Sequence, residues 1–362
     1  MTHSYDTFFQ LVRLGIGTSG EAKIPNDIDW LELKTLADSQ ELGAVVLDGI
    51  DRLNTNRPDS TNELPLKNKL EWIGEVIQNY EQRYKYYEEA IGSLAGFYNQ
   101  HGFKMMVLKG YACSLCWPTP NHRPCGDIDI WLFGQWREAD EALLKEYGVK
   151  IDRSHHHHTV FEWEGFAVED HYDFVNVHAH KSSEELEVIF KELGADDSNF
   201  IDVNGGTVYL PAPNLHALFL IKHMVSHFAA ANITLRQVLD WAFFAKKHTK
   251  EIDWGWLTGM LTKFHMTEFY NCINAICVGD LGFDVKIFPN VQFVPTMKDR
   301  VLKDILSPAY TAAEPRGIMR RTVYKYRRWQ ANAWKQAMCY GESRWEMFWR
   351  GVWNHLLKPG SI

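Results

Sequence analysis

The sequence of 362 residues has no long apolar run, no basic excess and few cysteines. No stretch approaches the roughly 18 consecutive apolar residues that a membrane-spanning helix needs. The first residues have neither the basic start nor the apolar core of a secretory signal, so we expect a cytoplasmic protein without a membrane span. The formal net charge of −8 argues against a dedicated DNA-binding surface, because nucleic-acid footprints are basic.

The six cysteines do not form the paired CxxC…CxxC arrangement of a structural zinc site. Cys113 and Cys116 make a single CxxC, but residues three apart on a helix share a face, which usually packs inward. Free cysteine commonly behaves as a small buried apolar side chain. We therefore expect reduced thiols without a metal or redox role.

Apolar and aromatic residues are abundant, at 46% and 14% of the chain, which is ample material for packed cores. The pattern of expected elements indicates an α+β fold, in which a small mixed β-sheet lies between helical parts. We predict a helical region over residues 1–102, a mixed core over 103–210 and a helical domain over 211–362.

Helical periodicity dominates the two ends of the chain. It predicts helices within residues 5–16, 27–53 and 67–101, with a loop over 54–65. Asp27 or Asp29 stands where it can cap the second segment, and Gly102 ends the long third one. After residue 210 the pattern is helical again, apart from a loop-like interruption around 279–295.

The middle of the chain alternates strands and helices. Strands are predicted at 104–109, 127–132, 154–164, 166–174 and 207–210. Helices are predicted at 111–117, 135–147 and 183–193, and the proline-rich segment 118–124 must be a loop. Gly165 separates two of the strands, as in a hairpin, and a second glycine-rich turn covers 204–206.

Two aspartates, Asp127 and Asp129, alternate with isoleucines in one predicted strand. Successive side chains of a strand point to opposite faces, so both carboxylates share one face. Such a like-charged pair repels, and it suggests a site for divalent cations, with Mg²⁺ as the first candidate and Mn²⁺ as another. We expect that changing either aspartate to asparagine abolishes the activity of the site and leaves the fold intact or slightly more stable, because it relieves this repulsion.

A second acidic strand supplies candidates for a third metal ligand. Glu169 is our choice, with Asp170 and Asp173 as alternatives. Three carboxylates on neighbouring strands suit a two-metal phosphoryl-transfer site, in which the metals hold the attacking and the leaving oxygens. His171, two residues from Glu169, either positions a ligand or phosphate or is a hydrogen-bonded structural residue.

These motifs together resemble those of the bacterial uncharacterised nucleotidyltransferase family, which belongs to the DNA polymerase β-like superfamily. The resemblance spans roughly residues 25–285 and rests on LKG at 108–110, GDIDI at 126–130, EDH at 169–171 and the helical stretch from Leu210. It implies a nucleotidyltransferase core over 103–210, in which Asp127, Asp129 and Glu169 hold Mg²⁺. The implied reaction moves a nucleoside monophosphate from a nucleoside triphosphate, such as ATP, to an acceptor and releases pyrophosphate.

By the same resemblance, Lys109 and Gly110 match the turn on the phosphate side. With them, we expect Arg123, Gly126 and His171 to contact the nucleotide. Tyr111 departs from the family pattern, because the superfamily usually has a second glycine or a serine after the glycine of this turn. The positive charges of Lys109 and Arg123 can compensate, since arginine can engage two phosphate oxygens at once.

Two other functions are compatible with the same residues. The first is a non-enzymatic module that binds a nucleotide and acts as a sensor or scaffold, which the Tyr111 substitution favours. The second is a metal-dependent phosphohydrolase, which would release phosphate without an acceptor. The acceptor itself, a small molecule, a protein or an RNA, is not determined by the fold.

Three further patterns have both a structural and a functional interpretation. The run His155–His158 is either an exposed polar strand edge or a transition-metal site. His223 with His227, and Arg236 with Asp240, form either a second wall over the nucleotide or simple pairs within helices. The basic and aromatic segment 319–357 is either a helix whose tryptophans face the core or a surface for membrane or RNA. Its tryptophans are Trp329, Trp334, Trp345, Trp349 and Trp353.

Overall fold

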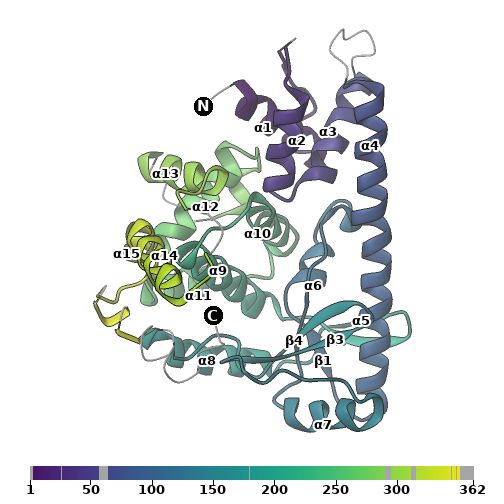
Figure 1. Ribbon diagram of the computed structural model, residues 1–362, viewed down its shortest axis with the longest axis vertical. Coiled ribbons are helices and arrows are strands. Elements are labelled where there is room, and N and C mark those ends of the chain that lie inside the picture. Colours follow the sequence, from purple (N-terminus) through teal and green to yellow (C-terminus); the bar gives the residue numbers. More distant parts are fainter. Residues whose placement is uncertain are drawn as a thin grey trace.

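A six-stranded mixed β-sheet, flanked by helices, lies toward one end of the described part of the molecule (Figure 1). The computed structural model describes residues 3–25, 27–56, 64–178, 180–289, 295–310, 315–343, 345–347 and 349–350. The strands are β1 (Met105–Val107), β2 (Ile128–Trp131), β3 (His158–Trp163), β4 (Phe166–His171), β5 (Phe200–Val203) and β6 (Gly206–Tyr209). Their order is β3-β4-β2-β1-β6-β5, and the pairs β2–β4 and β1–β6 are parallel. The predicted α+β class is confirmed.

Two tight turns form the hairpins of this sheet. Glu164 and Gly165 both have positive φ, at 49° and 82°, and join β3 to β4. Asn204 and Gly205 do the same between β5 and β6, with φ of 50° and 87°. Positive φ at both central residues twists the chain as the flanking strands require, which is why asparagine and glycine are favoured there. The glycine turns were predicted, whereas the edge strand β5 was not.

One face of the sheet is covered by a long helix that runs along the side of the molecule (Figure 1). It consists of α4 (Leu66–Val76), a π-helical segment (Ile77–Gln82) and α5 (Arg83–Gln100). The helix predicted over 67–101 is therefore confirmed, with a π-helical turn inside it. α5 packs against β1, β5 and β6, and with α7 (Trp136–Tyr147) it buries the apolar side chains of this face, among them Ile128 and Ile130.

The opposite face of the sheet joins a larger apolar cluster. The cluster takes in the N-terminal helices α1 (His3–Ile16), α2 (Trp30–Ser39) and α3 (Gly43–Asn56), and the short α6 (Gly110–Ser114) and α8 (Lys181–Gly194). The predicted N-terminal helices are confirmed, and the Asp29 side chain caps α2 by accepting from two backbone amides. Most of the loop predicted over 54–65 lies outside the described residues.

The part of the chain that follows the sheet is mainly helical. Its described helices include α9 (Pro213–Ala230), α10 (Leu235–His248), α11 (Trp254–Lys263), α12 (Thr267–Gly279), α13 (Pro295–Leu306), α14 (Ile318–Ala331) and α15 (Ala333–Cys339). The interruption predicted near 279–295 contains a 3₁₀ turn at Val285–Ile287, and residues 290–294 lie outside the described ranges. The larger apolar cluster contains residues from Phe8 to Met347, and the division into three domains stays a prediction. Within the described residues, no helix has the length and apolar character to cross a bilayer.

The tryptophans near the C-terminus do not form one stripe that faces the core. Trp334 packs against Phe228, but Trp345 and Trp349 are 70% and 57% exposed, so the core-facing prediction is wrong for these two. The reason is that α15 ends at Cys339 and Tyr340 is extended, so the helical period does not continue to Trp345. Trp353 lies outside the described residues.

The segment that follows β4 is held by a buried carboxylate, and this arrangement predicts a pH dependence of stability. Glu187 on α8 accepts hydrogen bonds from the backbone amides of Phe174 (3.1 Å) and Val175 (3.0 Å). Burial raises the pKa of Glu187 to about 7. The folded state therefore binds the proton of the Glu187 carboxyl group more tightly than the unfolded state does. The stability that this proton contributes is fully present below the unfolded pKa and is lost as the pH rises through 7.

We therefore expect the free energy of unfolding of the wild type to fall by about 3 kcal/mol between pH 4.5 and pH 8 because of this group. Glu187→Gln should not show this fall. Urea unfolding midpoints at several pH values in this window measure the difference. Glu184 lies on the same helix and is exposed, so Glu184→Gln serves as the matched control and should follow the wild-type curve. Parallel curves for the wild type and Glu187→Gln would contradict the prediction.

Candidate active site

The parallel pairing of β2 with β4 places two carboxylates next to each other. Asp129 on β2 is in register with Glu169 on β4, and both side chains lie on the face opposite to the buried isoleucines of β2. Asp127 stands immediately before β2. These three residues line one cavity of about 520 Å³ between the sheet, α9 and α10.

The two alternatives to Glu169 lie elsewhere. Asp170 is fully buried and, as the next residue along β4, points to the opposite face of the sheet. Asp173 follows the strand, and its carboxylate pairs with Lys191 at 2.5 Å. The structure therefore brings Glu169, and neither alternative, next to Asp129.

Two cations approach Asp129, which is only 4% exposed. Lys109 Nζ lies 2.6 Å from Asp129 Oδ1, and His171 Nε2 lies 3.2 Å from the same oxygen. Burial acts to raise the pKa of Asp129, but Lys109 and His171 outweigh it and hold the pKa well below its usual value. Burial likewise acts to lower the pKa of His171, but its hydrogen bonds to Asp129 and Glu169 raise it to about 9.

Asp127 has a different electrostatic environment, although it belongs to the same cavity. Desolvation and the neighbouring charge of Asp129 raise the pKa of Asp127. Its position is fixed through the backbone, because the Tyr87 hydroxyl donates a hydrogen bond to the Asp127 carbonyl (2.8 Å). Of the two aspartates, Asp129 is therefore neutralised by nearby cations and Asp127 is not.

The turn before α6 requires glycine for a specific reason. Gly110 has a φ of 36°, and a Cβ atom there would lie 2.4 Å from the Tyr87 hydroxyl oxygen. Tyr111 points away from the cavity, since its hydroxyl donates to Glu88 Oε1 (2.9 Å) and its ring packs against Tyr84 and Tyr87. Its side chain is therefore part of the packing around α5 and does not replace the missing serine.

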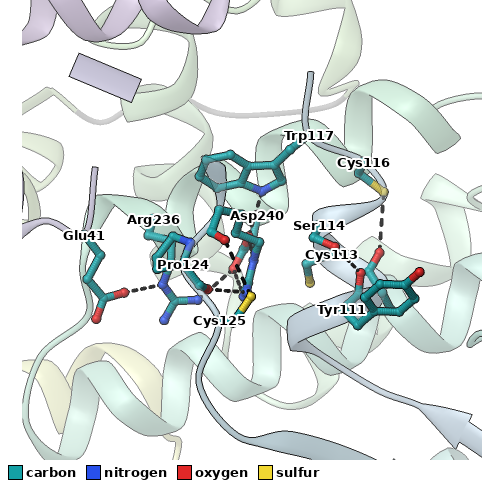
Figure 2. A network of polar contacts seen from close by, with 12 residues as sticks. Glu41, Tyr111, Cys113, Ser114, Cys116, Trp117, Pro124, Cys125, Arg236 and Asp240 are labelled. Carbon is teal, nitrogen blue, oxygen red and sulfur yellow. Dashed lines mark hydrogen bonds and ion pairs between the residues drawn. The ribbon is translucent and has the colours of Figure 1, made fainter. Parts of the chain in front are cut away.

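Arg123, which was expected to contact phosphate, is 4% exposed and makes a two-pronged ion pair with Asp240. The distances are 2.7 Å from Nε to Oδ1 and 2.9 Å from Nη2 to Oδ2. The same carboxylate accepts from the Trp117 indole (2.9 Å) and from Arg236 (3.0 Å), and Arg236 also pairs with Glu41 (Figure 2). Arg123 and Gly126 both line the cavity, but Arg123 joins the proline-rich loop to α10.

Helix α9 supplies the opposite wall. His223 and His227, four residues apart on α9, both line the cavity, with ring centres 4.3 Å apart. Burial, followed by the charge of Lys109, lowers the pKa of both histidines, which favours their neutral form. Arg236 and Asp240 of α10 line the same cavity. Both helical pairs therefore line the cavity that contains the acids, and Arg236 with Asp240 also forms the ion pair within α10 that the other interpretation expected (3.0 Å).

The histidine run lies beside the site and is not an exposed strand edge. His156 and His158 are 6% and 7% exposed, and only His158 belongs to β3. The predicted exposed edge is wrong because residues 155–157 bend inward before the strand starts. His158 Nε2 lies 3.9 Å from Glu169 Oε1, and burial lowers the pKa of His158 to about 4.

The donor atoms suit a divalent cation. Asp129, Glu169 and His171 offer ligand atoms that lie within 4.8 Å of one another, as do His157, His158 and His171. The carboxylates fit Mg²⁺ or Mn²⁺, which prefer oxygen ligands. The raised pKa of His171 favours an imidazolium that donates hydrogen bonds to the two carboxylates, so we assign it a positioning role.

Comparison with known proteins identifies the family. A family described as uncharacterised nucleotidyltransferase matches residues 26–278, which covers most of the chain. The chain belongs to this family. Nucleotidyl transfer is accordingly its general chemistry, and a nucleotide is the substrate that the family implies. Neither a search of curated proteins nor a search of solved structures gives a match.

Two residues near the candidate site were not singled out from the sequence. Tyr87 lies on the long helix before the sheet, and nothing in its local sequence marks its hydrogen bond to the Asp127 carbonyl. Lys222 had a signal that was overlooked, because it is a single lysine within the largely apolar run LFLIKHMV of α9. A buried helix with one charge in its middle indicates a functional role for that charge.

Proposed function

We propose that this protein is a Mg²⁺-dependent nucleotidyltransferase, which moves a nucleoside monophosphate from a nucleoside triphosphate to an acceptor hydroxyl and releases pyrophosphate. The observation that supports this most directly is the register of Asp129 with Glu169 on parallel strands. With Asp127 on the same side, three carboxylates meet in a cavity large enough for a nucleotide.

Asp127, Asp129 and Glu169 would hold the metal. Bound there, Mg²⁺ or Mn²⁺ supplies charge that lowers the pKa of the acceptor hydroxyl and stabilises the departing pyrophosphate. His171 keeps the carboxylates of Asp129 and Glu169 oriented, since its Nε2 lies within 3.6 Å of both. Lys109 stands at the turn beside Gly110 and pairs with Asp129. With a metal ion on Asp129, the Lys109 ammonium can pair with a phosphate oxygen instead.

A non-enzymatic nucleotide-binding module is the second candidate, and one observation favours it. The Tyr111 hydroxyl donates to Glu88 and its ring packs against Tyr84 and Tyr87. The residue after Gly110 therefore offers no hydroxyl to a phosphate in the cavity. Arg123, the other expected phosphate ligand, is held by Asp240. If this alternative is right, triphosphate binds without transfer to any acceptor.

The test is calorimetric titration of the four nucleoside triphosphates, as non-hydrolysable analogues with Mg²⁺, into the full chain. We expect binding of at least one analogue, and its loss in the Asp127→Asn/Asp129→Asn double variant. Glu162→Gln, an exposed carboxylate of β3 outside this cavity, is the matched control and should bind like the wild type. Absence of metal-dependent binding for all four analogues would contradict the proposal.

A further inference from the structure

A second cavity, of about 590 Å³, adjoins the one that contains the carboxylates. Lys109, Glu169, His223 and His227 line both, so the two spaces meet at the candidate catalytic residues. The second cavity extends from there between the histidine run, α9 and the C-terminal helices α14 and α15. Its volume suits a small molecule.

The two cavities differ in charge. The first is lined by five carboxylate side chains, which suits metal ions. The second is lined by four lysine or arginine side chains and seven histidines, and Glu169 is the single carboxylate among its described lining residues. A cavity with low-dielectric walls and one sign of charge concentrates ligands of the opposite sign, so this space favours an anion.

Lys222 is the most unusual of these cations because it is 3% exposed. Its Nζ donates to Ser226 Oγ (3.0 Å) and lies 5.1 Å from the centre of the Tyr340 ring. Within the described ranges no carboxylate comes within ion-pair distance of it, and Glu342 pairs with His180 instead (3.4 Å). Burial lowers the pKa of Lys222 to about 8 and outweighs the opposing effect of Cys339 and Glu342, which fits a buried charge without a close counter-ion.

Helix α14 brings two more cations and a flat aromatic surface to the same space. Lys325, Arg328 and Trp329 are spaced as i, i+3 and i+4, so they share one face of α14, and all three line the second cavity. The guanidinium of arginine binds phosphate with two parallel hydrogen bonds. With Lys222, three cations line this one cavity, which matches a doubly charged phosphate better than a singly charged carboxylate.

We propose that the second cavity is the acceptor site, and that the acceptor is a small molecule with a phosphate group, held by Lys222 and Arg328, and a free hydroxyl directed toward Glu169. The direction of the hydroxyl rests on the proposed nucleotidyl transfer, whereas the anion site does not depend on it.

In the reaction the hydroxyl oxygen bonds to the α-phosphorus of the triphosphate. The bond from that phosphorus to the β-bridging oxygen breaks, pyrophosphate leaves with its electron pair, and the hydroxyl proton passes to water. The phosphate of the acceptor is unchanged.

The first experiment measures binding of inorganic phosphate to the full chain in the presence of EDTA, which removes divalent cations. We expect Lys222→Met and Arg328→Gln each to weaken phosphate binding by about tenfold or more, as the loss of a charge-assisted hydrogen bond predicts. Lys246→Met, an exposed lysine of α10 outside both cavities, should bind like the wild type. Near-ultraviolet circular dichroism confirms that each variant is folded.

Unchanged phosphate affinity in both cavity variants would overturn the anion site, and so would binding of acetate as tight as that of phosphate. Asp127→Asn should retain phosphate binding, because Asp127 lines the first cavity and not the second. If Mg²⁺–triphosphate fails to bind while Lys222-dependent phosphate binding persists, the anion site stands and nucleotidyl transfer is wrong. The two proposals therefore fail in distinguishable ways.

The second experiment tests the acceptor class with triphosphates labelled at the α-phosphate and with matched pairs of alcohols. The pairs are ribose with ribose 5-phosphate and glycerol with glycerol phosphate. We expect label only on phosphorylated members, and Lys222→Met should raise KM for the acceptor by about tenfold or more without changing KM for the triphosphate. Label on unphosphorylated members at equal rates would overturn the acceptor assignment and leave the transferase proposal intact.

Discussion

Asp127→Asn and Asp129→Asn are each expected to reduce nucleotidyl transfer on the order of 10³-fold, yet to change the free energy of unfolding in different directions. Asp129 is buried between Lys109 and His171, and those two cations hold its pKa down. Stability from a carboxyl with a lowered pKa is present above its unfolded pKa, so Asp129→Asn removes it at pH 7. Removing one member of a buried charge group destabilises by about 3–5 kcal/mol.

For Asp127→Asn we expect the opposite change in the free energy of unfolding. Its pKa is raised by desolvation and by Asp129, so its charged form is disfavoured in the folded state at pH 7. Asp127→Asn removes that unfavourable charge and should leave the unfolding midpoint unchanged or slightly higher. Urea denaturation at pH 7 beside the transfer assay measures both effects, with Glu162→Gln as the control. Equal destabilisation by both substitutions would show that the two carboxylates are not electrostatically distinct.

This difference between the aspartates could not be predicted from the sequence. Alternation in GDIDI was enough to place both carboxylates on one face, because a strand has a period of two. Repulsion then suggested the same effect for both substitutions. The pattern does not show that Lys109 and His171 approach Asp129 and not Asp127. That depends on the order of β1, β2 and β4 in the sheet.

The fold was predictable where local pattern determines structure. The amphipathic period of residues 67–101 and the glycines at 165 and 205 suffice for a long helix and two hairpins. The edge strand β5 was missed because one of its faces is largely exposed, with Phe200 60% exposed, so its apolar pattern is weak. The burial of His156 and His158 was also missed, because it comes from a bend that packs the run against β4.

The ligands of the site were predictable only in part, for a similar reason. Glu169 follows from a resemblance and an alternating strand, and the structure sets it beside Asp129. Arg123 looked like a phosphate ligand because it is a cation in a loop near the acids. Its partner Asp240 lies on a helix far along the chain, and a long-range pair of this kind has no local signal.

That pair gives the second large expected effect: Asp240→Asn should lower the free energy of unfolding by about 3–5 kcal/mol. Its carboxylate pairs with the buried Arg123, as no other carboxylate of the described ranges does, and it also accepts from Trp117 and Arg236. Arg236→Gln is the matched control within the same network. It removes the ion pairs of Arg236 with Asp240 and Glu41. Arg236 is 20% exposed, so the substitution should lower the free energy of unfolding by at most about 1 kcal/mol.

The physical origin of the Asp240 effect is separable by a double variant. Arg123→Met/Asp240→Leu replaces both charges with apolar side chains, so no buried charge is left without a partner. We expect this variant to recover most of the stability that Asp240→Asn loses, as measured by urea unfolding midpoints of all four proteins. If the double variant is as unstable as Asp240→Asn, the destabilisation comes from lost packing between the proline-rich loop and α10, and the uncompensated Arg123 charge is not its cause. If Asp240→Asn is no worse than Arg236→Gln, the pair does not hold that loop in place, and Arg123 is then free to turn toward a phosphate in the cavity that it lines.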